Sequence, residues 1–213
     1  GPSIYDCIFL DLFSGSGGKM IGEKVAERLG IKCYDKELLA IASKNSGLCE
    51  ELFQRHDERP TNSFLYSLVM DSYSMGYTGS TYADMPINHK IFLAQFDTIK
   101  KLADEASCVI VGRCADYALA DYPGMVSVFI CGDEADKIKR VQEYYDLTAD
   151  KAKEVMIKTD KQRSSYYNYY SNKKWCDPRS YDLCLNSSAV GIDGAVEAIL
   201  QFAEIKKKYK SHK

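Results

Sequence analysis

Apolar and polar positions divide the chain into two kinds of segment. Continuous apolar runs are typical of strands buried on both faces of a sheet, and three of them stand out, at residues 7–13, 108–112 and 126–132. Elsewhere apolar residues recur every three or four positions, which predicts helices over residues 19–29, 88–106 and 133–145. Strands that alternate with helices predict an α/β fold with a mainly parallel sheet covered by helices.

Weaker signals complete this pattern. Residues 31–34 and 181–188 predict two further, shorter strands, which brings the expected sheet to five strands. Gly30 is a typical stop for the helix before it, and Asp35 can cap a helix over residues 36–44. A terminal helix is expected over residues 193–210, where the tail is basic.

Two stretches interrupt the alternation of strands and helices. Residues 46–87 are polar and irregular, and residues 147–180 are helical, strongly charged and rich in tyrosine. Both are expected to be segments inserted at the edge of the sheet, so that residues 1–213 form a single domain. Inserted segments of this kind commonly close over a substrate.

Composition excludes several classes of protein. The 28 Lys and Arg residues and 30 Asp and Glu residues give a net charge of −2, which argues against nucleic acid as a partner. No apolar run approaches the roughly 18 residues that span a bilayer, so no membrane partner is expected. The eight cysteines form no CxxC pair, and several lie in apolar runs, which predicts free thiols in a reducing cytoplasm.

A glycine-rich segment follows the first strand and is called here the glycine loop (residues 13–20, FSGSGGKM). Such a loop before a helix directs several backbone N–H groups at one point, where a phosphate binds. The standard pattern is GxxxxGK[ST]. Aligning on "GK" makes Lys19 the phosphate lysine and puts Met20 at the hydroxyl position, whereas aligning on "SGSG" puts Gly18 at the lysine position. Both alignments lack the magnesium-binding hydroxyl.

The loop is therefore expected to bind the donor phosphates mainly through its backbone. The competing interpretation is a tight turn without a ligand, because glycine turns are common. The predicted donor-binding residues are Ser14, Gly15, Ser16, Gly17, Gly18, Lys19 and Met20.

Four stretches together resemble the cytidylate kinase-like family of P-loop kinases. They are SGSGGKMIGEKVAERLGIKCYDKELL, CVIVGRCADYAL, DKQRSSYYNYYSNKKW and YDLCLNSSAVGIDGAVEAI. The resemblance implies a P-loop NTPase fold with a five-stranded parallel sheet, an acceptor-binding lobe at residues 46–87 and a lid at residues 147–180. It also implies ATP and Mg²⁺ as donor and metal.

On the acceptor side, the resemblance points to Arg113, Asp35 and Asp116. Arg113 lies in "GRC", which matches a GRD stretch of cytidylate kinases, and a guanidinium fork suits an acceptor phosphate. Cys114 replaces the aspartate of that stretch, which puts cytosine specificity in doubt. Asp35 either orients the attacking oxygen or simply caps the next helix, and a surface ion pair is the alternative for Arg113.

In the lid, the resemblance points to Asp160 and Arg163, which match a D-x-x-R spacing, with Arg140 at the base of the lid. Arginines there would neutralise the charge that develops on a transferred phosphoryl group. The alternative is a set of ion pairs on solvated helices. Lys19, Arg113, Arg163 and Asp35 are the predicted catalytic residues.

The expected function is ATP-dependent phosphoryl transfer to a nucleoside monophosphate, with a cytidylate-like acceptor favoured. One alternative is a kinase for another small-molecule acceptor, because the fold does not fix the acceptor. Another is a degenerate kinase that senses nucleotide, which the missing hydroxyl favours. The sequence leaves the oligomeric state and the metal ligands open.

Overall fold

Five parallel strands form the sheet at the centre of the protein, as the computed structural model shows for residues 6–48, 51, 52, 54 and 87–210. The strand order is β2-β3-β1-β4-β5. Cys7 is paired with Cys108 on one side and with Met125 on the other. The prediction of an α/β fold with a five-stranded parallel sheet is confirmed. The strands are β1 (Cys7–Leu12), β2 (Lys32–Tyr34), β3 (Cys108–Val111), β4 (Met125–Cys131) and β5 (Leu183–Asn186).

Among the helices whose bounds the structure describes, α7 and α10 differ from the positions that the sequence predicts. A four-residue helix, α7, escaped prediction because it is too short to show a period. The last helix begins at Ser187 because two helices meet at Gly191, whose φ of 72° and ψ of 173° are not helical. The helices are α1 (Gly18–Leu29), α2 (Glu37–Ser46), α6 (Ile87–Glu105), α7 (Ala115–Ala118), α8 (Glu134–Tyr145), α9 (Ala149–Ser171) and α10 (Ser187–Lys210).

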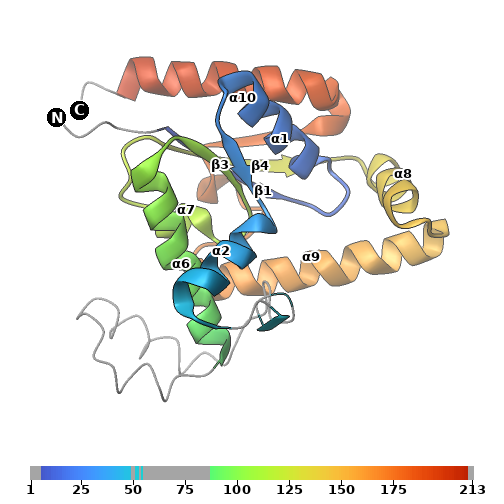
Figure 1. Ribbon diagram of the computed structural model, residues 1–213. Helices are drawn as coiled ribbons and strands as arrows, with labels where there is room; N and C mark the ends of the chain where they lie inside the picture. The colour runs from blue at the N-terminus through green and yellow to red at the C-terminus, as the bar shows by residue number, and fades with distance from the viewer. Residues whose placement is uncertain (1–5, 49–50, 53, 55–86, 211–213) are drawn as a thin grey trace.

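The two faces of the sheet carry separate cores, because successive side chains of a strand point to opposite faces. Leu10 of β1 packs with residues of α1 and α10, including Ile21 and Ile199. Phe9, the preceding residue, packs with residues of α6 and α9, including Phe92 and Tyr170. Figure 1 shows α1 and α10 along one face and α6 and α9 along the other. The sheet is therefore covered on both sides, as its continuous apolar strands require.

The two inserted segments differ in how much of them the structure describes. The segment predicted to be a lid, residues 147–180, keeps the name lid below and contains α9 and a short 3-10 helix at Pro178–Ser180. Its helix packs against α8 through a small core in which Val141 contacts Ala152 and Met156. The expected acceptor lobe at residues 46–87 lies almost entirely outside the described residues. Among the described helices, none has the length and apolarity that crossing a bilayer requires.

Candidate functional site

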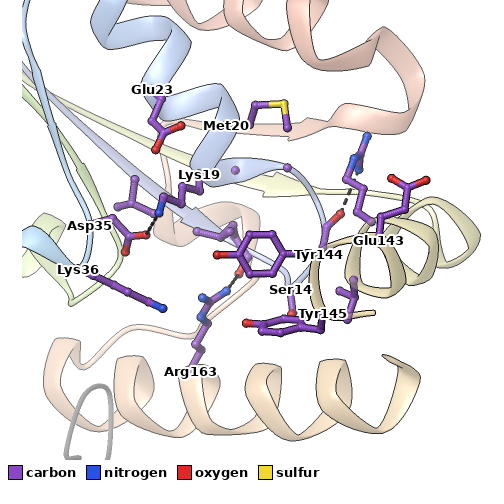
Figure 2. A pocket seen from close by; sticks show the side chains of 17 residues that line it. Ser14, Lys19, Met20, Glu23, Asp35, Lys36, Glu143, Tyr144, Tyr145 and Arg163 are labelled. Carbon is purple, nitrogen blue, oxygen red and sulfur yellow. Dashed lines mark hydrogen bonds and ion pairs between the residues drawn. The ribbon is translucent and has the colours of Figure 1, made fainter. Parts of the chain in front are cut away.

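The carboxyl ends of three neighbouring strands meet at one edge of the sheet. The glycine loop follows β1, Asp35 follows β2 and Arg113 follows β3. In α/β sheets this edge is where ligands bind. A cavity of about 630 Å³ opens there, between the loop, the first turns of α1, the end of α8 and Arg163 of α9 (Figure 2). Its volume is in the range of sites for small molecules.

Glycines shape the loop because its backbone is left-handed and tightly packed. Gly15 and Gly17 have φ of 80° and 83°. A Cβ on Gly15 would lie 2.5 Å from the carbonyl oxygen of Lys137, and one on Gly17 would lie 2.5 Å from Cδ1 of Ile192. Helix α1 starts at Gly18, and both Gly17 and Gly18 line the cavity. The N-terminus of this helix therefore faces the cavity with free N–H groups and positive potential, which suits a phosphate.

Ser16 faces the interior, although it was predicted to contact the donor phosphates. Its side chain is fully buried, and it does not line the cavity. Its carbonyl oxygen accepts a 2.6 Å hydrogen bond from the hydroxyl of Ser187, which also donates to the carbonyl of Cys131. Ser16 therefore anchors the loop to the start of α10 and the end of β4.

Asp35 lies between Lys19, which was predicted to contact the donor phosphates, and Arg113, which was predicted to hold the acceptor. Its carboxylate is 3.9 Å from Nζ of Lys19 and accepts a hydrogen bond from the guanidinium of Arg113. Arg113 is only 6% exposed and also donates to the carbonyl of Val111 at 2.9 Å. The structure thus brings together Lys19, Asp35 and Arg113, three of the four predicted catalytic residues.

The backbone that carries Arg113 is strained. Gly112, Arg113 and Cys114 have φ of 74°, 58° and 54°, so three successive residues are left-handed. Residues other than glycine adopt this conformation rarely, and strain of this kind gathers at functional sites. The strained turn directs the guanidinium of Arg113 back across the edge of the sheet to Asp35.

The third acceptor-side prediction, Asp116, lies in the interior. Its side chain is fully buried and does not line the cavity. The hydroxyl of Tyr167 donates to it at 2.6 Å, and Nζ of Lys173 lies 3.3 Å away. Burial raises the pKa of Asp116, while the charge of Lys173 and the bond from Tyr167 oppose that rise. The geometry gives Asp116 the role of joining α7 to the lid.

The lid helix α9 is hydrogen-bonded to the backbone where β1 leads into the glycine loop. The carboxylate of Asp160 accepts a 2.7 Å hydrogen bond from the amide of Ser14, and Arg163 donates to the carbonyl of Leu12 at 3.4 Å. Burial raises the pKa of Asp160, whereas the Ser14 amide and the charge of Arg163 lower it. Arg163 lines the cavity, so the two lid residues bring α9 to the loop and place one guanidinium within the site.

Helix α8 contacts the same loop from its other side. Arg140 donates to the carbonyl of Gly15 at 3.0 Å. The ammonium group of Lys137 lies 4.5 Å from the centre of the Phe13 ring, a cation–π contact. Arg140, which was predicted at the base of the lid, therefore belongs to the site.

Five cavity-lining residues with charged or aromatic side chains were not predicted from the sequence: Glu23, Lys36, Glu143, Tyr144 and Tyr145. For Glu23 and Tyr144 the available signal was helical spacing, because residues four apart share one face of a helix. Glu23 follows Lys19 by four positions, and Tyr144 follows Arg140 by four positions. Tyr144 and Tyr145 are 71% and 56% exposed, so packing in the core does not explain why aromatic residues stand at these positions.

The donor atoms at the site fit a magnesium ion that is held mostly by water and phosphate. No group of three His, Cys, Asp or Glu side chains within the described part of the chain could hold a metal alone. Met20 occupies the expected hydroxyl position and is 50% exposed. The carboxylates of Asp35 and Glu23 line the cavity, and Mg²⁺ commonly binds through one or two carboxylates plus substrate phosphates.

Comparisons of sequence agree with the resemblance. A model of the cytidylate kinase-like family matches residues 8–189, most of the chain. A protein of Archaeoglobus fulgidus named cytidylate kinase is 25% identical over 200 residues, which cover 91% of this chain and 92% of that protein.

Comparisons of structure agree as well. An uncharacterised protein from Eubacterium ventriosum has a TM-score of 0.67 and 31% identity, and the match covers 93% of this chain and 98% of that one. A shikimate kinase from Bacteroides thetaiotaomicron has a TM-score of 0.52, with the same coverage and 12% identity. At that identity the likeness shows the fold alone, which is the P-loop kinase fold.

Proposed function

The chain belongs to the cytidylate kinase-like family, and on that premise we propose that it transfers the terminal phosphoryl group of ATP to a nucleoside monophosphate, with a cytidylate-like acceptor favoured. One observation carries the proposal. The glycine loop, Lys19 and Arg163 line one cavity at the carboxyl edge of the sheet, and Asp35 joins that cavity to Arg113. Positioning and charge are what phosphoryl transfer requires from a protein.

On the donor side, the chain offers a backbone cradle and one mobile cation. The N-terminus of α1 and the left-handed Gly17 present N–H groups to the phosphates. Lys19 is 46% exposed, so its ammonium group is free to move from Asp35 to the outer phosphates. Arg163 approaches from the lid and would offset the negative charge of the group in transfer.

On the acceptor side, Arg113 and Asp35 act as a pair. The buried guanidinium of Arg113 is held in place by Asp35 and by the carbonyl of Val111. An acceptor phosphate that arrives beside Arg113 gains a fork of donors that is already oriented. Asp35 would accept a hydrogen bond from the attacking oxygen or from a water on the metal.

A bound magnesium ion would supply charge neutralisation at the phosphate oxygens. Asp35 and Glu23 are the residues that would hold it, through water, since Met20 cannot act as the missing hydroxyl. All other contributions come from the side chains and amides described above.

A second candidate is a kinase for another small acceptor on the same fold. It is favoured by the residues found at and after the position of the aspartate in the GRD stretch of cytidylate kinases. Cys114 stands where that stretch has aspartate, and Asp116 is buried against Tyr167 and Lys173 instead of lining the cavity. Neither residue lines the cavity, and we infer that the acceptor differs from cytidylate if the GRD aspartate is what reads the base. A degenerate kinase that senses nucleotide is the remaining alternative, because the hydroxyl for the metal is absent.

The proposal is tested by measuring ADP formation from ATP and magnesium with each ribo- and deoxynucleoside monophosphate, and with shikimate as an acceptor that lacks a base. Each reaction is checked for its phosphorylated product, which is the matching nucleoside diphosphate or, for shikimate, a phosphate monoester. Turnover that depends on a pyrimidine nucleotide is the expected result. Turnover with shikimate alone would favour the second candidate, and ATP binding without turnover on any acceptor would favour a sensor.

A further inference from the structure

Two adjacent tyrosines lie at the end of α8 and line the cavity above the glycine loop. Tyr144 and Tyr145 are 71% and 56% exposed, and their rings meet edge to face with centroids 4.7 Å apart. Figure 2 shows both rings extending from α8 into the cavity, with their hydroxyl groups toward the side where Lys19 and Arg163 lie. Large exposed aromatic rings inside a charged cavity require a reason beyond packing.

The backbone that carries the tyrosines is held on both sides. Tyr144 lies one helical turn after Arg140, which is bound to the carbonyl of Gly15. The helix ends immediately after Tyr145, at the left-handed Asp146. There the amide of Leu147 donates to the carbonyl of Gln142, and the side-chain amide of Gln142 donates to the carbonyl of Leu147. The position of Tyr144 over the loop is thus fixed by the contacts of α8.

The charged side chains that line the cavity are more often positive than negative. The four cations that line it are Lys19, Lys36, Arg140 and Arg163, against the three carboxylates of Glu23, Asp35 and Glu143.

Contacts with the protein already occupy several of these cations. Arg140 and Arg163 each donate to a carbonyl of the loop region, and Lys19 lies near Asp35. The hydroxyls of Tyr144 and Tyr145 bond no other residue in the described part of the chain. They are therefore available to a ligand.

We propose that the hydroxyl of Tyr144 donates a hydrogen bond to the terminal phosphate of a nucleoside triphosphate bound at the glycine loop, and so distinguishes a triphosphate from a diphosphate. The inference rests on the proposed function for the place of the donor phosphates. A hydrogen bond to a charged oxygen is stronger than one between neutral groups. The phenol supplies it without a further positive charge, and Tyr145 supports the ring from its edge.

The test compares the affinities of wild type, Tyr144→Phe, Tyr145→Phe and Tyr209→Phe for ATP and for ADP, each with magnesium, by titration calorimetry. Tyr209 is a matched control, because it is also 71% exposed and lies on α10 outside the cavity. Removal of one hydrogen bond to a charged group predicts that Tyr144→Phe weakens ATP binding by about tenfold. Its ADP binding, and both affinities of Tyr209→Phe, should match wild type.

Several results would overturn this inference. One is unchanged ATP affinity in Tyr144→Phe, and another is an equal loss for ATP and ADP. Tyr144→Leu separates the ring from the hydroxyl: if it loses both nucleotides while Tyr144→Phe behaves as wild type, the ring stacks on the base and the hydroxyl is not the contact. A wild type that binds neither nucleotide would also refute it.

Binding is measured without an acceptor, so this experiment does not depend on turnover. A wild type that binds ATP but forms no nucleoside diphosphate from a monophosphate would refute transfer to that acceptor class and still show whether Tyr144 contacts the terminal phosphate. The substitutions are at exposed positions, where effects on folding are small.

Discussion

A single carboxylate, Asp35, serves two cations that belong to opposite sides of the site. Lys19 is half exposed and 3.9 Å away, whereas Arg113 is buried and hydrogen-bonded to it. Lys19 can leave Asp35 at little cost, because an exposed ion pair contributes little. Arg113 is buried, so the loss of its hydrogen-bonded carboxylate is expected to be more costly.

Replacement of Arg113 by Ala is expected to lower kcat/KM for the acceptor by about 10²–10³-fold, since it removes an oriented donor. The ATP affinity of this variant should be nearly unchanged.

Lys19→Ala should instead weaken ATP binding. Steady-state kinetics and titration calorimetry on both variants check this. Loss of ATP binding in a folded Arg113→Ala protein would show that Arg113 is not on the acceptor side.

Burial at Asp116 predicts a dependence of stability on pH. Its pKa is raised above 3.8 in the folded protein, mainly by burial, so the folded state binds the proton more tightly than the unfolded state. The contribution of Asp116 to the free energy of unfolding is therefore fully present below 3.8 and is lost as pH rises through the folded pKa. Asp116→Asn removes this pH-dependent contribution, because an amide does not titrate.

Urea unfolding of wild type and Asp116→Asn between about pH 4 and pH 7 measures the effect. We expect the difference in stability to shift in favour of the variant as the pH rises. Lys173, which loses its partner in the variant, is 38% exposed and stays solvated. A constant difference across this range would mean that burial does not control the titration of Asp116.

Among the elements, the strands, the longer helices and the glycine loop could be predicted from sequence, because their signals are local. The contacts that complete the site could not. Asp160 accepts a hydrogen bond from Ser14, which lies 146 positions earlier in the chain, and no local sequence pattern predicts a contact between residues so far apart. Asp116 was assigned to the acceptor because it follows Arg113 closely, but the left-handed turn at Cys114 directs α7 and its aspartate toward the lid.

The junction between the loop and α8 is tested by Gly15→Ala. The added Cβ would lie 2.5 Å from a backbone oxygen of Lys137, which cannot move without shifting α8. Gly30→Ala is the matched control, with a φ of 66° and nothing within 4 Å of the new Cβ. It should cost only the left-handed penalty of about 1–2 kcal/mol.

Thermal unfolding should show a clearly larger loss of stability for Gly15→Ala than for Gly30→Ala, and only the former should weaken ATP binding. Equal losses would indicate that the close approach of the loop to α8 is easily relieved and has little part in the site.

At the scale of the whole molecule, a sheet with its two covering layers gathers residues from across the chain at one edge. The lid and α8 hold the loop through Asp160, Arg163 and Arg140. The family and the fold support a phosphotransferase. Asp35 and Arg113, which follow β2 and β3, are the residues that we propose for the acceptor side.

The most direct test of phosphoryl transfer follows the terminal phosphoryl group itself. ATP labelled with ¹⁸O in that group is incubated with magnesium, the protein and a pool of nucleoside monophosphates, and mass spectrometry locates the label. We expect the label in a nucleoside diphosphate, foremost that of cytidine or deoxycytidine, and much less of that labelled product with Arg113→Ala. Label found only in inorganic phosphate, or retained in ATP, would contradict it.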